Sequence, residues 1–113
     1  MSPYIMPGLI KNPLDIKGII DAVSEHVEIA PDIIIKKSMV ADKVYARRLV
    51  FYFARKYTML TLDGIATRMN ISIPSIFHGV DKINHEMEVK NNKTVKLVTA
   101  IKRTLMKEYK MIN

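Results

Sequence analysis

Residues 62–83, LDGIATRMNISIPSIFHGVDKI, carry the pattern that decides the fold. Apolar side chains recur at helical spacing on two segments that are separated by a short break. They are Leu62, Ile65, Ala66 and Met69 on the first segment, and Ile76, Val80, Ile83 and Met87 on the second, longer one. Each segment thus has one apolar stripe to bury. The stretch predicts a helix-turn-helix, with an αα-corner in a helical bundle as the alternative.

The break Asn70-Ile71-Ser72 has the residue types that a tight turn between helices needs. Asn70 tolerates left-handed backbone, and Ile71 can fill the angle between the helices. Ser72 is a suitable N-cap for the second helix, as Thr61 is for the first. We therefore expect the outer face of the second helix, from Ser72 to Asn84, to enter a DNA major groove. That face comprises Ile73, Pro74, Ser75, Phe77, His78, Asp81 and Lys82.

A long helix is expected before this stretch, from Lys43 to Tyr57. Its apolar positions mark it as the central core helix. They are Leu49, Val50, Phe53, Ala54 and Tyr57, with Phe51 and Tyr52 beside them. A basic loop, residues 36–43, precedes it, and Arg47 and Arg48 lie near its start. The loop is either a solvated connection or part of a nucleic-acid contact.

The outer parts of the chain also read as helical. Helices are expected from Pro13 or Leu14 to His26, over a short turn at Asp32 to Ile35, and after a cap at Thr94. No strand pattern competes, so the sequence predicts an all-α orthogonal bundle of five to six helices over residues 14–113. Residues 1–13 hold three of the five prolines and predict an irregular arm, which could pack on the domain or join two copies as a homodimer.

Charge is unevenly distributed along the 113 residues. Residues 1–30 hold two lysines against four acids, net −2, whereas residues 31–113 hold 16 basic residues against seven acids, net +9. Together they give the net charge of +7 and a pI near 9.7. The basic excess lies with the helix-turn-helix segment, which favours a polyanionic partner over the alternative of an ordinary solvated surface.

Catalytic motifs are missing from the sequence. It has no cysteine, and His26, His78 and His85 do not form a metal-binding spacing. It has no glycine-rich phosphate loop and no nucleophile elbow. We therefore expect no enzyme activity, cofactor, metal or small-molecule substrate. Without a signal peptide or a run of about 18 apolar residues, we expect no membrane contact and a cytoplasmic, nucleoid location.

The order of these parts resembles a known family. A capped helix, the Asp32-Ile33-Ile34 turn, a basic loop, the segment ARRLVFYFARKYTMLTLDGIA and a helix-turn-helix ending in FHGVDKI are similar to domain IV of the bacterial replication initiator DnaA. The similarity spans residues 14–110 and implies a Trp-repressor-like helix-turn-helix fold. It implies DNA contacts from the basic loop, from an early arginine of the next helix and from the recognition helix. The matching residues are Lys36, Lys37 and Lys43 in the loop, then Arg47, His78 and Lys82, with Thr58, Leu62 and Ile65 at the entry to the helix-turn-helix.

The family signature Gly-Gly-Arg-Asp-His-Thr-Thr-Val is replaced here by residues 70–76, NISIPSI, one residue shorter. Its base-contacting Asp and His fall on Ser72 and Ile73. Ile73 cannot form a hydrogen bond but can pack on a thymine methyl, so modest sequence specificity and a steep salt dependence are expected.

Two functions follow. The first is a DNA-binding protein, regulatory or replication-associated, in which Arg48 joins the phosphate contacts and Ser72, Ile73, Pro74 and Ser75 supply base contacts. The second is a protein-interaction module that derives from an initiator domain and has an apolar patch at Ile73, Pro74 and Phe77. Clustering of Lys36, Lys37, Arg47, His78 and Lys82 on one face with Ile73 would favour the first.

Overall fold

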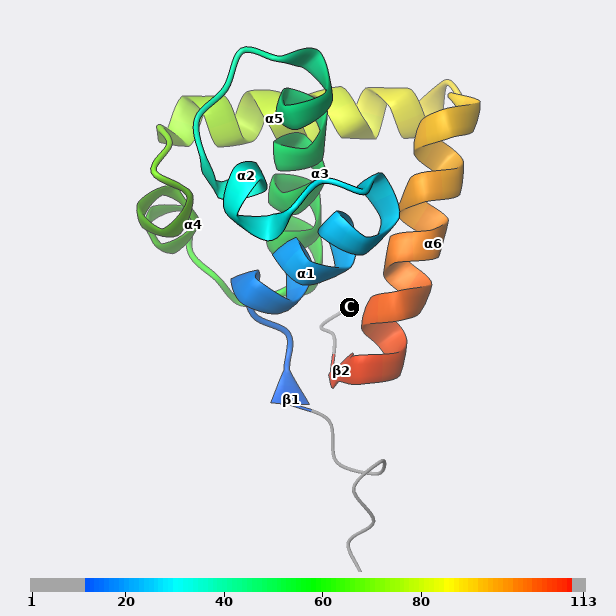
Figure 1. Cartoon of the computed structure of the whole chain (residues 1–113), viewed down its shortest axis with the longest axis horizontal. Helices are drawn as coiled ribbons and strands as arrows, with labels where there is room; N and C mark the ends of the chain where they lie inside the picture. The colour runs from blue at the N-terminus through cyan, green and yellow to red at the C-terminus, as the bar shows by residue number, and fades with distance from the viewer. Residues whose placement is uncertain (1–11, 111–113) are drawn as a thin grey trace, which may run out of the picture.

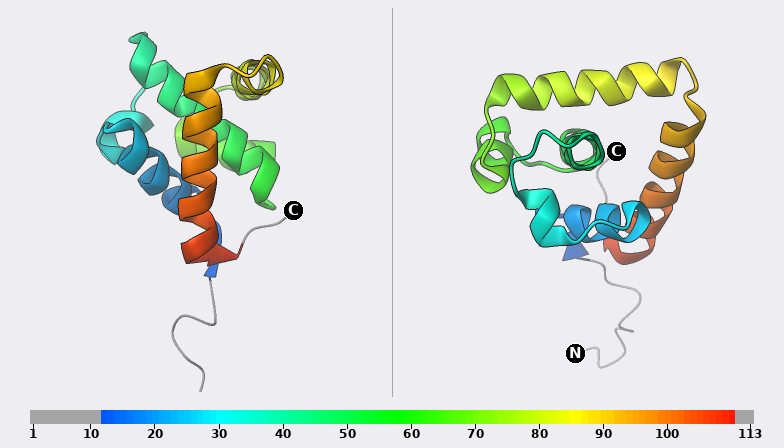
Figure 2. Two further views of the ribbon diagram at one scale, coloured as in Figure 1. Left: turned by 90° about the vertical axis from the view of Figure 1, so that its right-hand side faces the viewer. Right: turned by 45° about the horizontal axis from the view of Figure 1, so that its top comes forward.

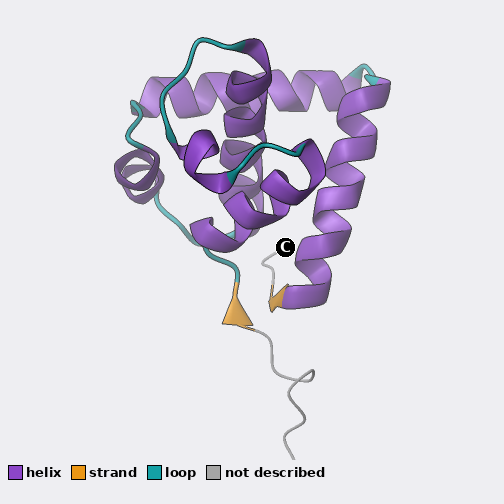
Figure 3. Cartoon of the chain, viewed as in Figure 1, coloured by secondary structure: helices purple, strands orange, loops and turns teal. Residues whose placement is uncertain are grey.

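The computed structural model describes residues 12–110, and the residues described contain six helices. These are α1 (Ile16–Val27), α2 (Pro31–Ile35), α3 (Ala41–Tyr57), α4 (Leu62–Met69), α5 (Ile73–Glu88) and α6 (Asn92–Glu108). Figure 1 shows α5 running across the top, α6 standing at one side and α4 at the other. The all-α prediction is confirmed (Figure 3).

Two short strands join the ends of the described chain. β1 (Asn12–Pro13) pairs in parallel with β2 (Tyr109–Lys110), and the Leu14 amide adds a hydrogen bond to the Lys110 carbonyl. The Tyr109 ring covers Gly18 so closely that a Cβ there would lie 2.5 Å from its Cζ atom. Residues 12 and 13 of the expected irregular arm thus pair with β2, and the rest of that arm lies outside the described residues.

Helix α3 is the centre of the fold, as predicted. The right-hand view of Figure 2 looks almost along it and shows α5, α6, α1, α2 and α4 arranged around it. All seven predicted core residues on it are buried, and Ala46 and Arg47 are buried with them. Phe53 packs edge-on against Tyr52 and stacks on Tyr57, with ring centroids 5.2 and 5.7 Å apart. This aromatic row fills the core, so it offers no surface for base stacking.

Helix starts differ from the prediction where capping decides them. The Asp15 carboxylate accepts a hydrogen bond from the Gly18 amide at 2.8 Å, so Asp15 is the N-cap of α1 and the helix begins at Ile16. Helix α3 begins at Ala41, two residues before the predicted start. Lys43 therefore belongs to the first turn of α3, and the basic loop comprises only residues 36–40.

The start of α6 was also assigned wrongly. Asn91, not Thr94, is its N-cap and accepts a hydrogen bond from the Thr94 amide at 3.1 Å. The Thr94 side chain is buried instead: its hydroxyl donates to Glu86 Oε1 at 2.5 Å and lies 2.7 Å from the Tyr45 hydroxyl. Because the Thr94 hydrogen goes to the carboxylate, the Tyr45 hydroxyl donates to Thr94. These three residues link α3, α5 and α6.

Candidate nucleic-acid interface

The predicted helix-turn-helix is confirmed in its local geometry. Thr61 caps α4 by accepting a hydrogen bond from the Gly64 amide at 3.0 Å. Asn70 adopts the left-handed conformation, φ 50° and ψ 57°, and Ile71 is half-buried in the angle between the helices. Ser72 caps α5, accepting from the Ser75 amide at 3.4 Å. The polar residues of the turn are thus used to end one helix and begin the next.

The outer face of α5 is exposed where the sequence predicts it, with one exception. Pro74, Ser75, Phe77, His78, Asp81 and Lys82 are exposed. Ile73 is half-buried, because it lies at the first position of α5 beside the turn. Phe77 keeps 46% of its surface exposed. The face therefore carries one large apolar ring between hydroxyl and basic groups.

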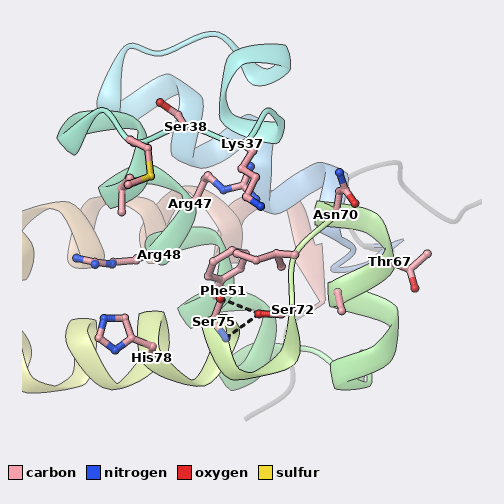
Figure 4. Close-up of a pocket in the computed structure, with 14 residues that line it drawn as sticks. Lys37, Ser38, Arg47, Arg48, Phe51, Thr67, Asn70, Ser72, Ser75 and His78 are labelled. Carbon is pink, nitrogen blue, oxygen red and sulfur yellow. Dashed lines mark hydrogen bonds between the residues drawn. The ribbon is translucent and has the colours of Figure 1, made fainter.

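A hollow of about 750 Å³ lies between the loop before α3, the first half of α3 and the start of α5. Figure 4 shows Arg48 from α3 and His78 from α5 at one side, Asn70 and Thr67 at the other, and Ser72 hydrogen-bonded to Ser75 between them. We call it the helix-turn-helix hollow. Six predicted site residues line it: Lys37, Arg47, Arg48, Ser72, Ser75 and His78. None of the described residues that line it is acidic.

The other predicted site residues lie outside this lining. They are Lys36, Lys43, Ile73, Pro74 and Lys82. Conversely, Ser38 and Thr67 line the hollow and were missed by the sequence reasoning. Thr67 follows the apolar pair Ile65 and Ala66, so its outward direction was visible in the helical spacing. Nothing local in the sequence marked Ser38.

Arg47, for which the sequence predicts a phosphate contact, is buried and bonded to backbone carbonyls. Only 4% of its surface is exposed. Its Nη1 donates to the Ile34 carbonyl at 3.1 Å and to the Ile35 carbonyl at 2.6 Å, and its Nη2 donates to the Met69 carbonyl at 3.0 Å. Burial lowers the pKa of Arg47, although an arginine in a protein stays charged. The guanidinium thus joins the ends of α2 and α4 to α3.

Arg48, the next residue, lies at the surface of the hollow, where a phosphate contact is possible. Its side chain is half-buried and lines the hollow. The described ion pair of Lys17 with Asp21, and the contact of His26 with Glu25, involve no residue of the hollow. The positive charges of Lys37 and Arg48 are therefore not neutralised by a described acidic side chain.

The described part of the chain forms no metal site. No group of three or more His, Cys, Asp or Glu side chains there could hold a metal ion. Among the helices of residues 12–110, none has the length and apolar content to cross a membrane.

Comparison with known proteins agrees with this geometry. The family model of the bacterial DnaA protein helix-turn-helix matches residues 16–83, from α1 into α5. The chromosomal replication initiator protein DnaA of Campylobacter curvus is 33% identical over 107 residues, covering 90% of this chain and 24% of the relative. That of Campylobacter concisus is 34% identical over 95 residues, covering 82% and 21%.

The DnaA of Oleidesulfovibrio alaskensis is 31% identical over 74 residues, covering 66% of this chain and 16% of the relative. The chain thus spans a quarter or less of the length of these curated relatives. Since the family model matches well over half of the chain, and the fold contains the helix-turn-helix that it describes, this chain belongs to the bacterial DnaA helix-turn-helix family.

Proposed function

We propose that this protein binds double-stranded DNA, with the first half of α5 in the major groove and residues 36–40 on the backbone or in the minor groove. The observation that carries the proposal is the helix-turn-helix hollow, which brings Lys37, Arg48 and His78 together without a lining acid. Membership of the DnaA family supports the same partner and a role in replication.

Phosphate contacts would come from side chains on both sides of the hollow. Lys37 and Arg48 supply full positive charges, and His78 lies on the same side of the close-up as Arg48 (Figure 4). The N-terminal end of α5 adds a partial positive charge from its backbone. Lys36 and Lys82 are exposed and extend the basic surface beyond the hollow. Contacts of this kind give affinity without sequence preference.

Base contacts would come from the outer face of α5. Ser75 carries a hydroxyl that can donate or accept, and the exposed Phe77 ring can pack on a thymine methyl. Ile73 is half-buried, which reduces the base contact expected of it. With one hydroxyl and apolar neighbours, this face supports modest sequence specificity.

Fluorescence anisotropy with a labelled duplex tests the proposal. We expect binding that weakens steeply between about 50 and 200 mM salt, with a log–log slope near −0.9 for each phosphate contacted. Lys37→Ala and Arg48→Ala should weaken binding to all sequences about equally, whereas Ser75→Ala should act on some sequences more than others. Absence of binding at the lowest salt would refute the proposal and favour the protein-interaction module, for which Phe77 would then be the anchor.

A further inference from the structure

A second basic groove lies on the far side of α5 from the helix-turn-helix hollow. It has a volume of about 730 Å³ and lies between the second half of α3, the end of α5 and α6. We call it the α6 groove. Its cationic lining residues are Lys56, Lys102, Arg103 and Lys107, and none of its described lining residues is acidic. Two of its edges, α6 and the end of α5, lie outside residues 16–83, which the family model matches.

Two of the four cations of this groove, Lys56 and Lys102, lie over aromatic rings. The Lys56 ammonium lies 5.2 Å from the centre of the Tyr52 ring and donates a hydrogen bond to the Tyr52 hydroxyl at 3.2 Å. The Lys102 ammonium lies 5.3 Å from the centre of the Tyr57 ring. Such contacts favour a cation over the ring face, and the hydrogen bond to Tyr52 raises the pKa of Lys56. The groove is therefore arranged for negative charge before any ligand arrives.

The groove offers charge and no stacking platform. Tyr52 and Tyr57 are only 3% and 4% exposed, so bases cannot stack on their rings. Lys102 and Lys107 are five residues apart on α6, about 7.5 Å along the helix. One strand of a duplex carries one phosphate per ~3.4 Å of axis, so this span matches about two phosphates. A phosphodiester backbone, read without sequence preference, fits this chemistry.

The two basic sites are separated by the crossing of α5 over α3. At the crossing, a Cβ on Gly79 would lie 2.9 Å from Phe51 Cδ2 and 3.2 Å from Arg48 Cγ, so the two helices are in close contact. Figure 2 shows α4 and the start of α5 on one side of α3, with α6 and the end of α5 on the other. A duplex that takes the start of α5 into its major groove therefore has α5 between itself and the α6 groove.

We infer that the α6 groove binds the phosphate backbone of a second DNA duplex, so that one copy of this domain can hold two DNA segments together. The inference rests on the proposed function for its first duplex. Binding of the second duplex depends only on the α6 groove. The proposed function and this inference can therefore fail independently of each other.

A bridging assay tests the inference. The full chain is added to a bead-bound duplex of about 12 base pairs, ~41 Å at 3.4 Å per pair, and capture of a second, fluorescent duplex is measured at low salt. The double variant Lys102→Ala/Lys107→Ala should capture the second duplex about tenfold less well, because two phosphate contacts are lost. Its affinity for a single duplex should be unchanged. The matched control is Lys93→Ala/Lys96→Ala, which removes two charges from α6 beside a different hollow that contains Glu28 and Asp42; it should bridge normally.

Other outcomes would overturn the inference. If Lys102→Ala/Lys107→Ala bridges as well as the unchanged chain, two copies are holding one duplex each. If it weakens single-duplex binding equally, the groove extends the first site. If an oligoglutamate peptide displaces the second duplex at lower concentration than DNA does, the groove takes an acidic protein segment. If the helix-turn-helix binds no duplex but the α6 groove still does, the proposed function is refuted and the inference about the α6 groove is supported.

Discussion

Replacing Arg47 with alanine separates a structural role from a DNA contact. The change removes three hydrogen bonds from a charged donor to the carbonyls of Ile34, Ile35 and Met69. A hydrogen bond from a charged group contributes about 1.5–3 kcal/mol, and a buried acceptor left without a donor costs about 1–3 kcal/mol. Because these terms do not add and the Ile35 bond is only partly buried, we expect a loss of about 3–5 kcal/mol.

Urea unfolding followed by far-ultraviolet circular dichroism measures this loss. With a slope of about 2 kcal/mol per molar urea, the midpoint should fall by roughly 2 M. Arg47→Lys should be intermediate, because an ammonium cannot bond three carbonyls in the planar geometry of the guanidinium. Arg48→Ala is the matched control: it removes no described hydrogen bond, so it should lower the midpoint less than Arg47→Ala does, and it should weaken DNA binding. An unchanged midpoint for Arg47→Ala together with weaker DNA binding would refute the structural role and restore the direct phosphate contact.

Three further substitutions test other parts of the fold. Gly79→Ala should destabilise the protein by about 1 kcal/mol, because overpacking of its Cβ against Phe51, about 1–3 kcal/mol, outweighs the gain of about 1 kcal/mol in helix propensity; a urea midpoint equal to the original would contradict this close contact. Asn70→Ala should cost about 1 kcal/mol and Asn70→Gly less, because the turn requires left-handed backbone; equal unfolding free energies would contradict this reason. Burial raises the pKa of Tyr45 in the folded state. The stability that neutral Tyr45 contributes to the fold is therefore fully present below the unfolded pKa near 10, and it is lost as the pH rises above that value. The unfolding free energy should fall above about pH 10, and Tyr45→Phe should flatten that fall; an equally steep fall in the variant would exclude Tyr45 as a cause.

The sequence predicted the parts of the fold that depend on neighbouring residues. Caps and turn residues act within a few positions, so Thr61, Asn70 and Ser72 could be assigned correctly from the sequence alone. Helical spacing of apolar residues marked the buried face of α3 for the same reason. The helix-turn-helix and the central helix are therefore legible without a structure.

The cap errors at Asp15 and Asn91 are local, whereas the errors at Arg47 and Thr94 concern residues whose partners lie far away in the sequence. Arg47 bonds carbonyls that lie 12, 13 and 22 residues away, and Thr94 bonds Tyr45, 49 residues away. No local pattern distinguishes such an arginine or threonine from an exposed one. The α6 groove was likewise hidden, because the lysines of α6 look like an ordinary solvated face until α3 is seen packed beside them.

The position of Arg47 explains how a buried residue can govern the proposed DNA contacts. Ile35, which it bonds, ends α2 immediately before the loop that carries Lys37. Met69, which it also bonds, ends α4 immediately before the turn that carries Ser72. One guanidinium therefore fixes both edges of the helix-turn-helix hollow relative to α3, while Arg48 carries the charge that faces it. Loss of Arg47 would let the two edges move apart, so its effect on DNA binding should follow its effect on folding, whereas the effect of Arg48 should be mainly on binding.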